Sequence, residues 1–301
     1  MLTSYDALIK EDLIGSFQKF DLGEIQELSQ AEMPNFSWED QDRTLFLGID
    51  LQNDFMESGA LGVPGSHEDM KRTLQFIYHN FNRISQIMVS LDTHSLQQVF
   101  HPTWWVDRDG NHPAPLTIIR SKDIDAGSWR PVMAEEMTRD YVKGLEEHGN
   151  KDLCIWPFHC IEGTPGAALE SQFSRMVHFH TFVSGSPISK VVKGKDPYSE
   201  KYGIVEPEYS QDDLTDYALL SHLEKFDRIV IAGQAESHCV YESVRQICEY
   251  FYDRPEITKN IFVLKDCMSC IPGFEEETEK NWDRLKQYFH INLVHSKEFS
   301  L

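Results

Sequence analysis

Basic side chains are scarce in this chain of 301 residues. Lysine and arginine number 28 against 49 aspartates and glutamates, which gives a formal net charge of −21 at pH 7. So negative a surface repels the phosphate backbones of nucleic acids and the anionic headgroups of membranes, which argues against both as partners. The remaining composition, with 41% hydrophobic and 26% charged residues, is that of an ordinary globular protein.

Long apolar runs and a disulfide framework are also missing from the sequence. Every apolar run is far shorter than a membrane span, and the first residues, MLTSYD, lack the basic start of a signal peptide. Six cysteines in a chain of this length do not make a disulfide scaffold. We therefore expect a cytoplasmic protein whose cysteines are reduced.

Changes of pattern along the chain divide it into an arm and one large domain. Residues 1–42 are polar and acidic with weak helical periodicity, which predicts an N-terminal arm lying on the body or on a neighbouring subunit. From residue 43 to residue 301, short apolar runs alternate with amphipathic segments. A stretch at about 101–150, which starts with several tryptophans and prolines, interrupts this alternation and predicts a lid-like insertion.

The alternation of apolar runs and amphipathic segments predicts an α/β fold. The expected strands are residues 45–50, 87–92, 153–156, 177–183, 228–233, 261–265 and 291–294. The expected helices lie near 68–83, 167–175, 213–224, 239–251 and 275–288, and a further extended segment covers 190–194. Because right-handed crossovers place helices on both faces of such a sheet, we expect a mostly parallel sheet between two helical layers.

A lone cysteine lies on the turn between one expected strand and the helix that follows it. The segment GQAESHC, residues 233–239, comes after the strand and before the helical pattern. Helix N-termini offer unpaired N–H groups and the positive end of a dipole, which favour a thiolate and a developing oxyanion. Cys239 is therefore a candidate nucleophile, although a free cysteine is also often a small buried hydrophobe.

Reactive side chains also follow the other expected strands. In chain order they are Asp50, Asp92, His94, His101, His159 and, in the extended segment, Lys193. Ligands of open parallel sheets bind at the carboxyl ends of the strands. We therefore expect these residues to share one site with the cysteine.

Five of these segments, taken in order, resemble the cysteine hydrolases of the isochorismatase-like superfamily and are most similar to nicotinamidases, also called pyrazinamidases. They are DLQNDF at 50–55, DTH at 92–94, WPFHC at 156–160 with GTPG at 163–166, KG at 193–194, and GQAESHCV at 233–240. The resemblance extends from about Leu45 to Leu293 and is poorest over the insertion. It implies a three-layer αβα fold with a six-stranded parallel sheet.

The resemblance further implies a catalytic triad of Cys239, Asp50 and Lys193. Physical chemistry agrees, because a thiol needs a base or a positive field to ionise, and a carboxylate with a nearby ammonium supplies both. Taken alone, Asp50 is also consistent with the cap of a turn. The assignment of Lys193 competes with its neighbours Lys190 and Lys195.

The loop before the cysteine matches the oxyanion hole of the resembling enzymes. The resemblance implies that the backbone N–H groups of Ala235 and Cys239 form it, with a cis peptide bond between Gln234 and Ala235. At Glu236 and Ser237 the chain departs from the family, which usually has threonine and aspartate there. These departures leave the backbone role intact and weaken any inference about the side chains.

A metal site is the second feature that the resemblance implies. Metal-dependent nicotinamidases bind the ion at positions that match Asp92, His94 and His159, and some add a histidine where His101 falls. Imidazole nitrogens with a carboxylate suit a divalent ion, with zinc as our first expectation and iron or manganese as alternatives. His101 opens the insertion, so a solvated loop residue is the other interpretation. In this family the metal orients the substrate ring, and a role in generating hydroxide stays open.

Aromatic residues are expected to line the substrate pocket. Phe55 and Trp156 match positions that flank the substrate ring in nicotinamidases, and two core aromatics at strand ends are the alternative. Tyr198, Trp104 and Trp105 are candidates for further residues of a lid.

Two further patterns favour a structural role. The C-x-x-C at 267–270 has neither a second pair nor a thioredoxin pattern around it. His178 and His180 alternate along an expected strand, which favours structural histidines over ligands.

We expect an amidohydrolase that cleaves a small carboxamide through a cysteine thioester, with nicotinamide converted to nicotinate and ammonia in NAD salvage. One alternative is another small amide of ureido, carbamoyl or maleamate type. A catalytically weak interaction protein on the same fold is the second alternative. The expected partners are the small-molecule substrate and further copies of the chain in a homo-oligomer.

Overall fold

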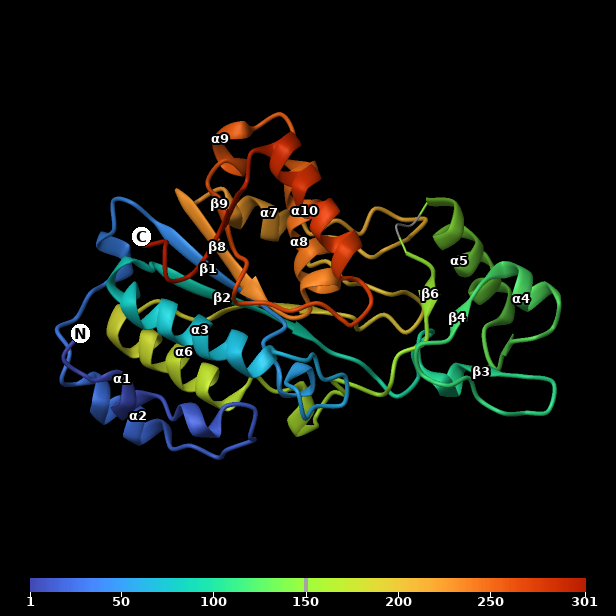
Figure 1. Ribbon diagram of the computed structural model, residues 1–301, viewed down its shortest axis with the longest axis horizontal. Coiled ribbons are helices and arrows are strands. Elements are labelled where there is room, and N and C mark those ends of the chain that lie inside the picture. The colour runs from blue at the N-terminus through green and yellow to red at the C-terminus, as the bar shows by residue number, and fades with distance from the viewer. Residues whose placement is uncertain (149–150) are drawn as a thin grey trace.

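A parallel sheet of six strands forms the middle of the molecule (Figure 1). The computed structural model describes residues 1–148 and 151–301. The strands are β1 (Thr44–Ile49), β2 (Gln86–Asp92), β7 (Ser189–Lys193), β8 (Arg228–Gly233), β9 (Ile261–Leu264) and β10 (Asn292–Val294). They lie in the order β10–β9–β8–β1–β2–β7, and every neighbouring pair is parallel. The expected α/β fold with a six-stranded parallel sheet is therefore confirmed.

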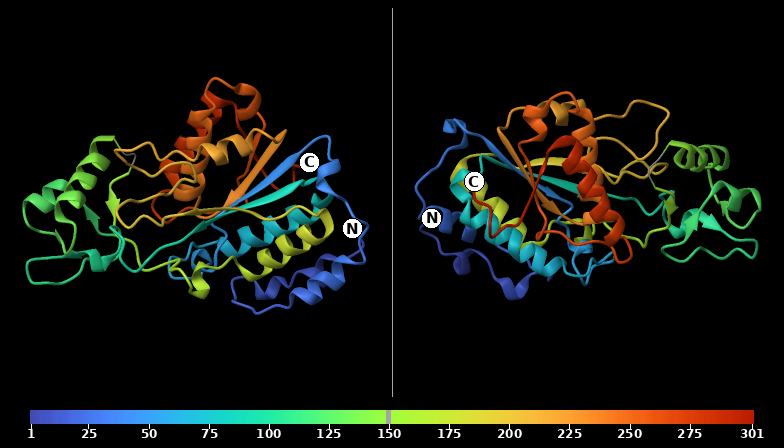
Figure 2. Two further views of the ribbon diagram at one scale, coloured as in Figure 1. Left: turned by 180° about the vertical axis from the view of Figure 1, so that it is seen from behind. Right: turned by 45° about the horizontal axis from the view of Figure 1, so that its top comes forward.

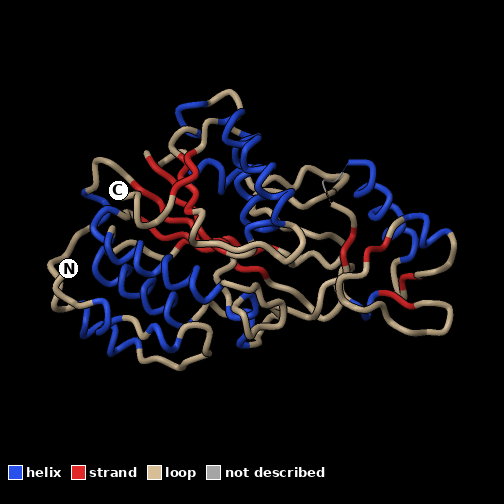
Figure 3. The backbone as a smooth tube through the Cα atoms, in the orientation of Figure 1, coloured by secondary structure: helices blue, strands red, loops and turns tan. Residues whose placement is uncertain are grey.

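Helices cover both faces of the sheet, and Figure 3 shows the strands between the two groups. On one face lie α3 (Ser66–His79) and α6 (Ser171–Ser184), and on the other α7 (Tyr217–Leu223), α8 (Tyr241–Tyr250), α9 (Pro255–Thr258) and α10 (Glu275–Phe289). Successive side chains of a strand point to opposite faces. Accordingly, Leu45 and Leu47 of β1 pack in the core under α8 and α10, whereas Phe46 packs in the core under α3 and α6.

The strand expected at 177–183 is wrong, because these residues belong to helix α6. The buried residues Phe173, Val177 and His180 recur at helical spacing, which the alternation around the two histidines obscured. The caps also mark a helix. The Glu170 side chain accepts a hydrogen bond from the Phe173 N–H at 2.8 Å, and Gly185 ends the helix at φ +66°.

The sixth strand of the sheet is β7 rather than the expected strand at 153–156. Only Leu153–Cys154 are extended there, as β6, and they pair antiparallel with β4 (Ile118–Ile119) outside the central sheet. Strand β7 pairs with β2 at the edge of the sheet, so its side chains alternate between the interior and solvent. That alternation and its two lysines weakened the strand signal in the sequence.

The N-terminal residues lie against helix α6 of the same chain. Helices α1 (Tyr5–Leu8) and α2 (Leu22–Ser29) occupy the outside of the layer formed by α3 and α6 (Figures 1 and 2). Leu8 and Ile25 are fully buried there. Arg175 of α6 donates to the Leu8 carbonyl at 2.9 Å and forms an ion pair with Glu24 at 2.9 Å.

The residues expected to form an insertion extend from one end of the molecule (Figure 1, right). They contain β3 (Trp105–Val106), β4, α4 (Ser121–Asp125), β5 (Arg130–Pro131) and α5 (Glu135–His148). The end of the expected insertion, residues 149–150, lies outside the described residues. Trp104 and Trp105 are buried inside this part, where their N–H groups donate to Thr138 Oγ1 and to the Val99 carbonyl.

A bilayer-spanning helix, both long and apolar enough to cross, is not found in the described parts of the chain.

Candidate active site

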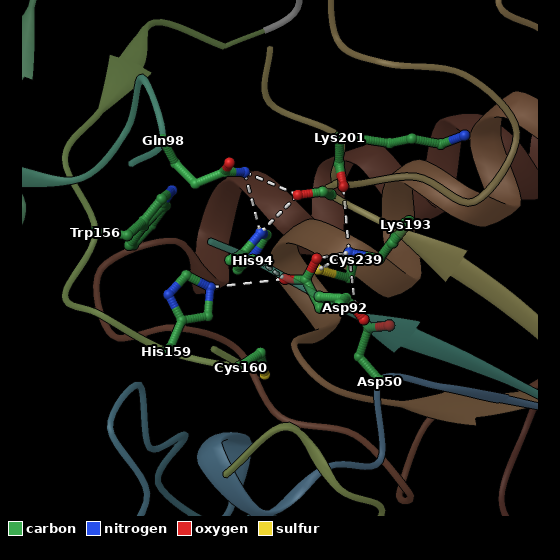
Figure 4. Close-up of polar contacts among 12 residues, drawn as sticks. Asp50, Asp92, His94, Gln98, Trp156, His159, Cys160, Lys193, Lys201 and Cys239 are labelled. Carbon is green, nitrogen blue, oxygen red and sulfur yellow. Dashed lines mark hydrogen bonds and ion pairs between the residues drawn. The ribbon is translucent and has the colours of Figure 1, made fainter. Parts of the chain in front are cut away.

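Four adjacent strands of the sheet bring four reactive side chains to the same edge (Figure 4). Asp50 directly follows β1, Asp92 ends β2, Lys193 ends β7, and β8 leads into the turn with Cys239. The neighbours β8–β1–β2–β7 are parallel, so their carboxyl ends meet at one edge. Residues nearly 190 positions apart in the sequence therefore share one site.

The Lys193 ammonium lies at the centre of this group. Its Nζ is 2.9 Å from Asp50 Oδ2, 3.2 Å from Asp92 Oδ1 and 3.6 Å from Cys239 Sγ. All four side chains are buried. The structure thus brings together the three residues that the sequence suggested as a triad, with Lys193 rather than Lys190 or Lys195 pointing inward.

A hydroxyl orients the Asp50 carboxylate. Ser90 Oγ donates to Asp50 Oδ1 at 2.5 Å and accepts from the Asp50 N–H at 2.9 Å. Asp50 has φ +47°, a left-handed backbone conformation that few non-glycine residues adopt. The carboxylate is therefore fixed in direction by its own backbone and by β2.

Burial and charge together set the protonation of these groups. Burial raises the pKa of the Cys239 thiol well above its usual value, and the Lys193 ammonium opposes this only in part. Burial likewise raises the pKa of Asp50. Burial alone would lower the pKa of Lys193, but the carboxylates of Asp50 and Asp92 outweigh it and raise that pKa well above normal. The resting site contains a protonated thiol and a charged ammonium, with Asp50 beside them to exchange a proton.

The turn that carries Cys239 has an unusual backbone. Gly233 adopts φ +149°, and a Cβ there would lie 2.0 Å from the Ile49 carbonyl oxygen, so glycine is required. The peptide bond between Gln234 and Ala235 is cis, as the resemblance implies. A π-helical turn, Glu236–Val240, then leads into α8. Within the described residues, the Ala235 N–H has no hydrogen-bond acceptor and is free to donate.

Asp92, His94 and His159 form a buried cluster with the geometry of a metal site. One ligand atom from each lies within 4.8 Å of the others. The Nδ1 atom of His94 contacts the Gly194 carbonyl at 3.0 Å, and that of His159 contacts the Pro157 carbonyl at 2.8 Å. A carbonyl only accepts, so each Nδ1 bears the proton and each Nε2 lone pair faces Asp92, at 2.8 Å and 3.6 Å from its Oδ2.

This arrangement fits a cation. His94 Nε2 is buried with no hydrogen-bond partner in the described structure, and it faces a carboxylate oxygen. An ion bound by these three residues would satisfy both lone pairs and the negative charge.

His101 stands beside the cluster rather than in it. Its ring centre is 6.0 Å from that of His94 and 6.1 Å from that of His159, and it is not among the three residues whose ligand atoms converge. It is fully buried, so the alternative of a solvated loop residue is wrong.

A cavity opens beside Cys239 and the cluster, and the empty space in it, including the part open to solvent, is about 370 Å³. Phe55 and Trp156, which the sequence suggested as substrate walls, both line it. Its other lining residues are Leu61, Val63, Asp92, His159, Glu200, Tyr202, Ala235, His238, Cys239 and Ile271. Trp104, Trp105 and Tyr198 do not line this cavity, and Tyr198 packs edge-on against Trp104 at 5.6 Å.

Sequence reasoning missed several walls of the cavity. Tyr202 accepts a hydrogen bond from Trp156 Nε1 at 3.1 Å, and burial raises the pKa of Glu200 to about 7. Both lie in an irregular segment after β7, where no periodicity points to a pocket. The sequence does indicate His238 as a possible wall residue, because it directly precedes the candidate nucleophile.

The patterns assigned a structural role do not contribute to the cavity. Cys267 and Cys270 are free cysteines and lie outside its lining. His180, on α6, is buried with its Nε2 2.8 Å from the Ile84 carbonyl.

Comparisons with known proteins define the fold. No protein-family model matches the chain, and a search of curated proteins finds no significant match. The sheet order and its helical layers are those of the isochorismatase-like hydrolase fold, which solved nicotinamidase structures share.

Two of these structures illustrate the likeness. The Acinetobacter baumannii nicotinamidase/pyrazinamidase is 16% identical over 86% of this chain and 99% of its own, with a TM-score of 0.58. The yeast nicotinamidase is 22% identical over 84% of this chain and 99% of its own, also with a TM-score of 0.58.

Proposed function

We propose that the protein is an amidohydrolase that cleaves a small carboxamide through a thioester on Cys239. One observation carries the proposal: the Lys193 ammonium lies 2.9 Å from Asp50 and 3.6 Å from Cys239, beside a cavity with aromatic walls. The cation thus contacts both the nucleophile and the proton acceptor, an arrangement that suits the activation of a thiol.

In the first half of the reaction the Cys239 thiol transfers its proton to Asp50 as sulfur attacks the amide carbon. Lys193 stabilises the thiolate through its positive charge. The oxyanion of the tetrahedral intermediate accepts hydrogen bonds from the N–H groups of Ala235 and Cys239. Protonated Asp50 then donates to the departing nitrogen, and ammonia leaves the thioester behind.

In the second half a water molecule attacks the thioester. Asp50 takes the proton of the water, the same oxyanion hole stabilises the new intermediate, and the C–S bond breaks. The carboxylic acid is released, and the Cys239 thiol recovers its proton.

We propose that Asp92, His94 and His159 bind a divalent ion, zinc in the first place and iron or manganese as alternatives. The bound ion would act as a Lewis acid toward the ring nitrogen of a pyridine carboxamide. The cluster borders the same cavity as the nucleophile, since Asp92 and His159 both line it. These residues therefore orient one end of the substrate while Cys239 attacks the other.

Nicotinamide is the substrate that we propose, with nicotinate and ammonia as products and NAD salvage as the context. The walls of the cavity include the rings of Phe55, Trp156, Tyr202 and His238. Burial lowers the pKa of His238 to about 3, so it presents a neutral ring. Aromatic walls suit a flat heteroaromatic ring, and solved structures with this fold are named nicotinamidases.

Ammonia release from nicotinamide tests the proposal. The wild-type protein should release it, and Cys239→Ala should lose at least about a thousandfold in kcat. Cys154→Ala, which changes a half-buried cysteine outside the lining of the cavity, should keep its activity. A chelator should abolish turnover, and one divalent ion should restore it. A panel of ureido, carbamoyl and maleamate-type amides identifies another substrate, and no Cys239-dependent turnover on any amide would leave an interaction protein on this fold.

A further inference from the structure

The turn that carries the nucleophile is fastened by a buried carboxylate that the mechanism does not use. Glu236 begins the π-helical turn, and its side chain faces away from the cavity, toward the end of β9 and helix α10. Glu236 is also one of the two positions at which the loop departs from the resembling family.

Three side chains hold the Glu236 carboxylate. Lys265, which follows β9, donates to Oε1 and forms an ion pair with it. Trp282 of α10 donates its ring N–H to the same oxygen at 2.9 Å, and the Cys270 thiol donates to Oε2 at 3.3 Å. Trp282 is fully buried and Glu236 is 8% exposed, so water does not replace these contacts.

Hydrogen bonds from backbone N–H groups join the turn that carries the nucleophile to the loop that follows β9. The Glu236 N–H donates to the Ser269 carbonyl at 2.8 Å, and Ser237 Oγ accepts from the Ile271 N–H at 3.1 Å. Gln234 Oε1 accepts from the Ser269 N–H at 3.4 Å. The loop at 234–237 is therefore tied along its length to the loop at 269–271, which also supplies the cavity wall Ile271.

The residues held by these contacts are next to the two N–H groups that would bind the oxyanion. Ala235 precedes Glu236, and Cys239 lies three residues after it in the same turn. An oxyanion hole depends on N–H groups held at hydrogen-bond distance before the reaction, because reorganisation during the reaction costs rate. A support of this kind affects the transition state more than the binding of the neutral substrate.

We propose that Glu236 is a positioning residue whose carboxylate, held by Lys265 and Trp282, fixes the turn from Ala235 to Cys239 and so sets the oxyanion hole. This inference rests on the proposed amidohydrolase function. It assigns a role in catalysis to a side chain that touches neither substrate nor nucleophile.

Glu236→Gln tests the inference, with Glu279→Gln as the matched control. Lys265 also pairs with Glu279 at 3.2 Å, but Glu279 is exposed on α10 and, within the described residues, makes no hydrogen bond or ion pair with the turn. The measurements are kcat and KM for nicotinamide and inhibition by nicotinaldehyde. The Cys239 thiol adds to the aldehyde carbon, the thiol proton passes to the aldehyde oxygen, and that oxygen lies in the oxyanion hole.

We expect Glu236→Gln to lower kcat and weaken nicotinaldehyde binding by about tenfold each, a fraction of the loss of a whole oxyanion donor, with KM within about twofold. The rate of Cys239 alkylation by iodoacetamide, followed on its peptide by mass spectrometry, should stay within about threefold, because alkylation needs the thiolate but no oxyanion hole. Glu279→Gln should match the wild type in all four measurements.

Two results would overturn the inference in an active wild type: equal kinetics for Glu236→Gln and Glu279→Gln, or a parallel fall of kcat and alkylation in Glu236→Gln. A wild type without turnover of any amide overturns the proposed function itself, which separates the two failures. If Glu236→Gln does not fold, Trp282→Phe removes the N–H donor together with part of the buried ring, and it must still lower kcat while KM and the alkylation rate stay near their wild-type values.

Discussion

Lys193 is the residue on which the charges of the site depend. It is a buried cation in contact with the carboxylates of Asp50 and Asp92. Breaking a buried ion pair by removing one partner leaves an uncompensated charge, which is more damaging than losing a contact at the surface. Activity and stability therefore depend on the same side chain.

We predict that Lys193→Met abolishes amide hydrolysis and lowers the free energy of unfolding by about 3–5 kcal/mol, because two buried carboxylates lose their cation. Lys190→Met is the matched control, three residues earlier on the same strand and exposed. Denaturant unfolding and ammonia release measure the two effects. Equal stability of the two variants would show that the ion pairs contribute nothing.

His180 is a buried histidine whose titration affects folding far from the site. Burial lowers its pKa to about 4, against about 6.5 in an unfolded chain. Between these values the unfolded state binds the proton and the folded state does not. The folded state therefore has its full stability above about pH 6.5, and the free energy of unfolding decreases as the pH falls toward 4.

We predict that the shifted pKa of His180 makes the free energy of unfolding about 2 kcal/mol lower at pH 5 than at pH 7. His180→Gln keeps a donor for the Ile84 carbonyl but does not titrate, so its stability should fall less steeply over this range. Urea unfolding at pH 5, 6 and 7 gives both slopes, and parallel slopes would contradict the prediction.

At the residue scale, the sequence indicated side chains that follow strands and missed those that do not. Asp50, Asp92 and Cys239 end or follow apolar runs, so the rule for parallel sheets located them. Tyr202 lies in an irregular segment. Glu236 follows the same strand as Cys239, but its side chain turns away from the cavity and no local pattern indicates what it contacts. Their positions depend on contacts made by distant segments.

Helix α2 attaches the N-terminal segment through a small apolar face. Ile25 is fully buried against the core that includes α6, whereas Leu22 on the same helix is 48% exposed. Arg175 adds an ion pair to Glu24, but that partner is largely exposed and contributes little. Apolar burial therefore carries most of the attachment.

We predict that Ile25→Ala lowers the free energy of unfolding by about 2–4 kcal/mol, because it leaves a cavity in a packed core. Leu22→Ala is the control and should cost less than about 0.5 kcal/mol. Chemical denaturation followed by tryptophan fluorescence compares them. Similar values for the two variants would mean that the segment is not a packed part of the domain.

At the element scale, the sequence indicated which segments are regular but misjudged two of them. Within α6, His178 and His180 alternate with apolar residues as in a strand. The pattern of buried residues over three turns and the caps are what identify the helix. Strand β7 is an edge strand with lysines, and its membership in the sheet depends on pairing with β2. Pairing partners come from other parts of the chain, so a local window does not contain them.

For the whole molecule, the net charge of −21 is the dominant electrostatic feature. Repulsion among like charges destabilises a compact state, and added salt screens it. The homo-oligomer implied by the resemblance stays a prediction, for which sedimentation equilibrium is the measurement.

We predict that raising sodium chloride from about 10 mM to about 300 mM stabilises the protein by about 1 kcal/mol, which is about 2 °C in Tm for a chain of this size. Thermal unfolding at a series of salt concentrations measures this. A Tm that falls with salt would mean that attractive ion pairs outweigh the net repulsion.

The sequence by itself determined the alternation of strands and helices, the residues that end the strands and the cysteine on its turn, because these depend on local periodicity and on short motifs. Tertiary structure alone decided which strands are neighbours. That order brings the Lys193 ammonium into contact with Asp50 and Asp92, while long-range packing closes the cavity with Tyr202 and His238 and holds Glu236 against α10. Sheet order and long-range packing are properties of the whole chain, so no single segment encodes them.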